Sequence, residues 1–142
     1  MWDKIVKVAS AGVGAVVSFW AGLGIMPQTL AVVMLVDYVT GVMCAVKGVS
    51  LKTESGHISS KAGFDGLMKK AAIILIVFVA TWLDQAIGTQ AMAAATMCFY
   101  IANEGVSILE NTSLLGVPYP AVLKNALEAL KEHEEHKGND EI

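Results

Sequence analysis

The sequence predicts an all-α integral membrane protein with about four transmembrane helices, followed by an amphipathic cytoplasmic helix at the C-terminus. Hydrophobic residues make up 55% of the 142 residues and charged residues only 16%, whereas soluble domains are about 45–50% apolar and about 25% charged. The apolar residues are gathered in runs close to the length of about 20 residues that a membrane helix requires. Their excess therefore indicates burial in lipid rather than in a soluble core.

The first two predicted spans are residues 8–26 and 28–46, on either side of Pro27. The first span carries no charge, and Lys4 and Lys7 precede it. It is longer than the apolar segment of a signal peptide, which is about 7–15 residues. Pro27 suits the first turn of a helix, where its missing N–H has no intrahelical partner to lose. We therefore expect two helices that form a tight hairpin.

A polar, Lys-rich loop at residues 47–70 separates this pair from two further spans, predicted at 71–88 and 90–109. The membrane domain is expected to comprise residues 1–118, and the charged tail residues 119–142. Within the tail, apolar residues recur at helical spacing, which predicts an amphipathic helix from Ala121 to His136.

The placement of lysine predicts the orientation. Every Lys lies in the N-terminus, the 47–70 loop or the tail, and the turns near Pro27 and at 88–90 have none. Cytoplasmic loops carry the excess of Lys and Arg. We therefore expect a multi-pass membrane protein with both termini cytoplasmic. A three-span alternative would place one Lys-bearing terminus outside.

Several functions are disfavoured by composition. All ten basic residues are Lys and the net charge is −3, which argues against nucleic acid as a partner because its backbone demands clustered cations. Cys44 and Cys98 lie in apolar runs and do not have the spacing of a zinc site. We find no phosphate-binding loop and no nucleophile–base pair, so we expect no enzymatic activity, no cofactor and no metal.

Small residues recur every four positions in the first span, which places them on one face of a helix. Such faces allow close approach of a second helix in lipid. Two interpretations remain open: packing against the second span, or self-association between copies. The residues of this small-residue stripe are Ser10, Gly14, Ser18 and Gly22.

Three acids are predicted at membrane depth: Asp37, Asp84 and Glu104. A charge at the bilayer centre costs about 2.5–3.5 kcal/mol on insertion scales. Asp37 is expected near the midplane, either hydrogen-bonded inside the bundle, lining an aqueous lesion or gating its assembly, or relaying ions. Lys69 and Lys70, at the start of the third span, are expected to be too far away to pair with it. Asp84 is expected near the outer interface, where water would solvate it.

Several strings resemble the toxin-secretion/phage-lysis holin family. They are DYVTGVMCAVKG at 37–48, SSKAGFDGLMKKA at 59–71, WLD at 82–84, YIANEGVSILEN at 100–111 and GVPYP at 116–120. By this resemblance, Gly63, Gly66 and Lys70 are also family-like positions. The candidates for lining a pore or for assembly are Asp37, Thr40, Gly41, Asp84, Asn103, Glu104, Ser107, Glu110 and Asn111.

The resemblance implies a protein that accumulates in the lipid bilayer of the bacterial cytoplasmic membrane and then assembles as a homo-oligomer. The lesions of such a holin release an endolysin, which causes host-cell lysis, or a large toxin. Two other classes remain open: a small channel or transporter subunit, and a membrane scaffold or antiholin that forms no pore.

Overall fold

The computed structural model describes residues 1–126, 128 and 129, except for the side chains of residues 16 and 19. This part of the chain contains four long helices, each long and apolar enough to cross a membrane. They are α1 (Trp2–Gly22), α2 (Ile25–Lys47), α3 (Ser60–Ile87) and α4 (Ala91–Leu114). The predicted all-α fold with four candidate spans is confirmed. The helix predicted at 121–136 begins as expected at residue 121, and half of it, residues 127 and 130–136, lies outside the described residues.

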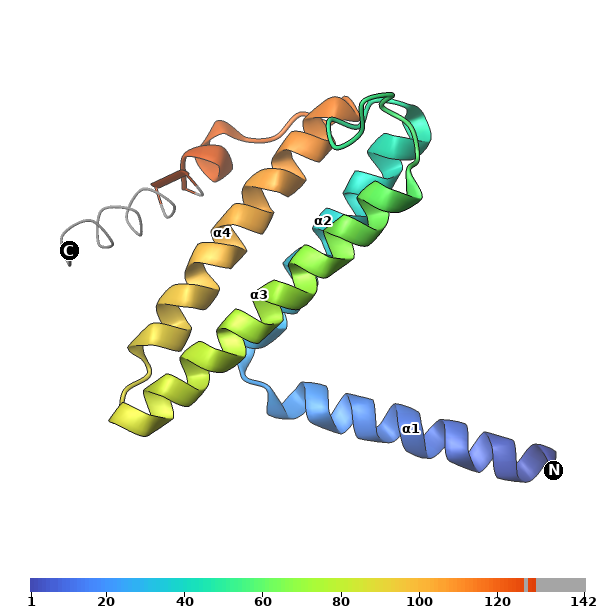
Figure 1. Ribbon diagram of the computed structural model, residues 1–142, viewed down its shortest axis with the longest axis vertical. Coiled ribbons are helices and arrows are strands. Elements are labelled where there is room, and N and C mark those ends of the chain that lie inside the picture. The colour runs from blue at the N-terminus through green and yellow to red at the C-terminus, as the bar shows by residue number, and fades with distance from the viewer. Residues whose placement is uncertain (127, 130–142) are drawn as a thin grey trace.

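Helices α2, α3 and α4 lie side by side, with α2 and α4 parallel to each other and α3 antiparallel to both (Figure 1). Helix α4 packs against both of its neighbours, whereas α2 and α3 contact each other much less. The bundle is therefore closed along α4 and more open between α2 and α3.

Helix α1 leaves the bundle at the turn before α2 and points away from it (Figure 1). Each of its described side chains is exposed. The predicted tight hairpin with the second span is therefore wrong. The reason is that the buried face of α2, which includes Leu30 and Met34, is already covered within the three-helix bundle.

An apolar layer fills the bundle near the end where α1 joins. Its buried residues come from all three helices and recur at intervals that keep them on the inner face of each helix. They are Leu30, Met34, Ile73, Ala80, Ala93 and Met97. This apolar layer seals one half of the bundle, and the polar residues described below occupy the other half.

The connection between α2 and α3 is shorter than the predicted 47–70 loop. Gly48 ends α2 with a φ of +79°, a conformation that favours glycine, and Ser59 Oγ accepts a hydrogen bond from Ala62 N at the start of α3. Helix α3 therefore begins at Ser60, well before its apolar run. Polar residues can form the first turns of a helix that continues into lipid. Helix α4 likewise continues to Leu114, past the predicted end of its span.

Candidate functional site

Three charged residues from three helices meet inside the bundle. Lys70 Nζ on α3 donates to Asp37 Oδ2 on α2 at 2.8 Å, and it also donates to Glu104 Oε2 on α4. Each of these residues lies ten positions from the end of its helix on the loop side, at Lys47, Ser60 and Leu114. At about 1.5 Å per residue, the cluster therefore lies roughly 15 Å into the bundle.

Further polar neighbours form hydrogen bonds and an ion pair with Asp37. Asn111 Nδ2 donates to Asp37 Oδ1 at 3.2 Å and to Thr40 Oγ1 at 3.1 Å. The Asn111 carbonyl accepts from Cys44 Sγ at 3.2 Å. Lys52 Nζ, from the connecting loop, lies 3.6 Å from Asp37 Oδ1. These residues form one charge network that joins α2, α3, α4 and the loop.

Burial makes this network energetically important. The side chains of Asp37 and Glu104 are only 7% and 8% exposed, and that of Lys70 is 14% exposed. In the described part of the chain, every buried side-chain nitrogen and oxygen has a hydrogen-bond partner. The network contains two carboxylates and two ammonium groups, of which that of Lys70 is largely buried and that of Lys52 is 53% exposed. Removing one partner from such a buried pair typically destabilises a protein by about 3–5 kcal/mol.

The expectation that Lys70 would be too far from Asp37 was wrong. It depended on a third span starting at residue 71, which would place Lys70 at the membrane surface. Because α3 begins at Ser60, Lys70 is already ten residues into its helix and lies at the level of Asp37. Lys69, one position earlier, is exposed.

Asp84 has a different role, at the opposite end of the bundle. Its Oδ2 accepts from Ala93 N at 2.7 Å, and its Oδ1 accepts from Met92 N at 3.1 Å and from Thr89 Oγ1 at 2.5 Å. It is 3% exposed, so the expected solvated position was wrong. Asp84 satisfies two free N–H groups in the first turn of α4 and thereby fixes the turn between α3 and α4.

The remaining sequence candidates are dispersed around the network. Asn103 and Ser107 on α4 line a cavity next to it. A Cβ added at Gly41 would lie 3.5 Å from Lys52 Nζ and 3.7 Å from Asn111 Nδ2, both ordinary contact distances, so Gly41 lies directly beside the network. Glu110 is exposed. The structure therefore joins Asp37, Thr40 and Asn111 by direct hydrogen bonds and connects Glu104 to Asp37 through Lys70. Glu110 is left outside the network.

The small-residue stripe of α1 is not covered by any other element among the described residues. A Cβ added at Gly14 or Gly22 would meet no atom within 4 Å, and the Ser10 hydroxyl donates to the carbonyl of Lys7 in its own helix. The interpretation that this stripe packs against the second span is therefore wrong, and self-association remains a proposal.

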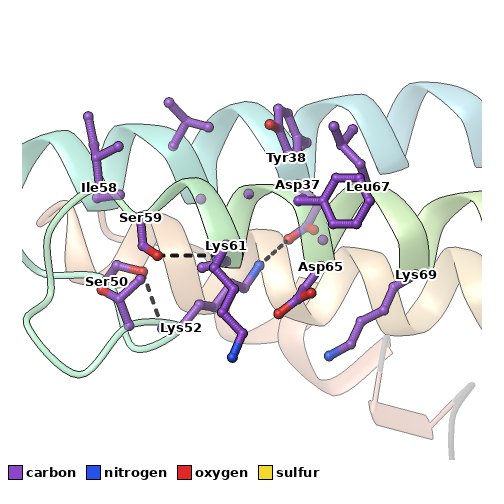
Figure 2. Close-up of a pocket in the computed structure, with 18 of the residues that line it drawn as sticks. Asp37, Tyr38, Ser50, Lys52, Ile58, Ser59, Lys61, Asp65, Leu67 and Lys69 are labelled. Carbon is purple, nitrogen blue, oxygen red and sulfur yellow. Dashed lines mark hydrogen bonds and ion pairs between the residues drawn. The ribbon is translucent and has the colours of Figure 1, made fainter.

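A cavity of about 1290 Å³ opens beside the network, between α2 and α3 and next to the connecting loop. In Figure 2, Ser50, Lys52 and Ser59 lie at the loop end of this cavity, and Asp37 and Leu67 lie further in. Lys70 and Glu104 also belong to its walls. Among the described residues, no group of three His, Cys, Asp or Glu side chains is arranged to hold a metal ion.

The long apolar helices and the internal charge network define a helical membrane protein. The sequence profile of the bacteriophage holin family matches residues 14–132. The chain therefore belongs to the bacteriophage holin family, and this membership supports a holin role.

One of the curated relatives is itself named as a probable holin. The chain is 33% identical over 109 residues to a probable holin of Bacillus phage phi105, a match that covers 76% of each chain. It is 42% identical over 104 residues to an uncharacterised 14.9 kDa protein of Clostridium perfringens, covering 72% of this chain and 74% of the relative. It is 35% identical over 127 residues to an uncharacterised protein of Listeria innocua, covering 88% and 86%. No solved structure matches the chain.

Proposed function

We propose that this protein is a pore-forming holin that oligomerises in the bacterial cytoplasmic membrane and opens lesions. Through these lesions an endolysin would reach the cell wall, or a large toxin would leave the cell. Support comes from the family membership, from the related probable holin of a Bacillus phage and from four helices of membrane-spanning length.

The observation that carries the proposal is the network around Asp37, Lys70 and Glu104. It pairs charges of three helices within one chain, so a single copy can reside in lipid without exposing an unpaired charge. This arrangement explains how copies would accumulate without harm. When copies become crowded, the same charged helix faces would separate from one another and turn toward water in an oligomer.

We infer that the membrane potential favours the paired state, because opening would move charges of the network through the membrane field. Each charge that crosses the full membrane field changes the free energy by about 2.3 kcal/mol per 100 mV. A local loss of potential would therefore promote opening of neighbouring copies. This gives a physical basis for a sudden transition rather than gradual leakage.

The outer surface of the bundle suits contact with lipid. Helix α3 exposes large apolar side chains along most of its length, including Leu75, Phe78 and Val79. The end of the bundle at the α2–α3 loop carries Lys47, Lys52 and Lys61, whereas the turns at residues 23–24 and 88–90, at the opposite end, have no Lys. This distribution supports a multi-pass topology with the α2–α3 loop and both termini in the cytoplasm, in which α1 crosses the membrane as a separate helix.

Induced expression in bacteria, with and without a co-expressed endolysin, tests the proposal. The culture should lose turbidity abruptly only when both proteins are present, and the holin alone should stop growth without dissolving the wall. Expression without any loss of viability would instead favour a scaffold or antiholin. Loss of viability with ion leakage, but without endolysin-dependent lysis, would favour a small channel.

A further inference from the structure

The cavity between α2 and α3 reaches from the connecting loop to the charge network. Its walls include Ser55 near the loop and Ser107 beside the network, together with Asp37, Lys70 and Glu104. Its volume of about 1290 Å³ is far more than a single water molecule needs. The network thus forms the inner end of a space that begins at the Lys-rich end of the bundle.

The lining of the cavity is suited to water. Hydroxyl groups occur along the walls beside apolar side chains such as Phe64 and Leu67. The charged residues are evenly divided between four lysines and four acids: Lys52, Lys61, Lys69 and Lys70, and Asp37, Glu54, Asp65 and Glu104. Figure 2 shows Lys61, Asp65 and Lys69 projecting from the same side of α3. Placing such groups against hydrocarbon without water would be costly, whereas the balanced charge gives no preference for an anionic headgroup.

The cavity ends where the apolar layer begins. Met34 lies three residues from Asp37 along α2, and Ile73 lies three residues from Lys70 along α3. Both side chains are buried, at 5% and 9% exposure, and Met97 of α4 packs in the same layer at 8%. A polar half and an apolar half of the bundle therefore meet directly below the network.

We propose that this cavity is an aqueous vestibule that admits water and small ions from the Lys-rich side of the membrane to the Asp37–Lys70–Glu104 network, and that the apolar layer closes it. The vestibule belongs to a single copy. It is thus distinct from the oligomeric lesion and does not depend on the proposed lytic function. It exposes the network to cytoplasmic ions before any assembly occurs.

Cysteine substitutions at three depths test the vestibule. The full-length chain, with Cys44 and Cys98 replaced by serine, receives Ser55→Cys at the mouth, Ser107→Cys at the inner end or Ala80→Cys in the apolar layer. The serine changes are close to isosteric, and Ala80→Cys adds one sulfur atom at a buried position. Inverted membrane vesicles are treated with the charged thiol reagent 2-(trimethylammonium)ethyl methanethiosulfonate, which does not cross lipid, and parallel samples are treated with N-ethylmaleimide, which does.

We expect the charged reagent to label Ser55→Cys and Ser107→Cys at rates within about tenfold of each other, and to leave Ala80→Cys unlabelled. Asn103→Cys, on the cavity wall, provides a second probe if Ser107→Cys does not insert. Spheroplasts treated from outside should leave Ser55→Cys unlabelled, which shows that the membrane is intact.

Two results would overturn the inference. Labelling of both Ser107→Cys and Asn103→Cys by the maleimide alone would mean that the cavity is filled by lipid or closed to water. Labelling of Ala80→Cys by the charged reagent in intact vesicles would mean that the apolar layer does not seal it. The labelling measurement does not require lysis. The vestibule can therefore be tested even if the chain proves unable to lyse cells.

Discussion

Lys70 Nζ lies 2.8 Å from Asp37 Oδ2, although the two residues belong to different helices and are separated by a whole connecting loop. The same ammonium group donates to Glu104, so one cation joins two carboxylates from α2 and α4. These contacts neutralise charge in the interior of a bundle whose outer surface is apolar. The stability of the bundle should therefore depend on this lysine more than on any exposed lysine.

Lys70→Met leaves the carboxylates of Asp37 and Glu104 buried without their shared cation. We expect the free energy of unfolding to fall by about 3–5 kcal/mol, the typical cost of breaking a buried pair. Thermal or denaturant unfolding of the detergent-solubilised protein measures this. The matched control is Lys69→Met, which removes an exposed ammonium group from the adjacent position and should have a much smaller effect. Equal losses for the two variants would contradict the role of Lys70.

Asp37→Asn removes a charge and weakens the attachment of α2 to Lys70, while it preserves the size of the side chain. We expect a changed onset of lysis with normal insertion into the membrane, measured by culture turbidity and by membrane fractionation. Glu104→Gln should change the onset in the same direction because it affects the same cation. Glu110→Gln, on the exposed side of α4, is the comparison and should change it far less. Wild-type timing in Asp37→Asn would remove this residue from the mechanism.

Asp84→Ala removes the carboxylate that accepts from the N–H groups of Met92 and Ala93. Loss of such a cap should lower the free energy of unfolding by about 0.5–2 kcal/mol. The effect should appear in the thermal unfolding of the solubilised protein. Thr89→Ala leaves both backbone contacts in place and should be less damaging. A larger loss for Thr89→Ala than for Asp84→Ala would refute the capping role.

Gly14→Leu and Gly22→Leu place a bulky side chain on the small-residue stripe of α1, which no other part of the described chain covers. If this stripe joins copies in lipid, each change should reduce the yield of crosslinked oligomers severalfold in intact membranes. Val13→Leu enlarges an exposed neighbour on a different face of α1 and should leave the crosslinked ladder unchanged. An unaltered ladder in the two glycine variants would exclude α1 as the assembly surface.

The four helices could be predicted from the sequence because each contains an apolar run that only lipid or a partner helix would cover. The helix ends could not be predicted from apolarity, since Ser59 caps the start of α3 well before the apolar run of that helix. That error also concealed Lys70 as the partner of Asp37. The capping role of Asp84 was missed for a different reason: it depends on a turn that returns the chain onto the carboxylate, which residue spacing alone does not reveal.

The size of the solute that escapes tests the lesion most directly. Cells that contain a folded fluorescent protein in the cytoplasm are induced to express the chain without endolysin, then treated to permeabilise only the wall, and the released fluorescence is measured beside potassium efflux. A holin that forms large lesions should release the folded protein together with potassium at a defined time after induction. Potassium efflux with full retention of the fluorescent protein would contradict lesion formation and identify the chain as a small-ion channel.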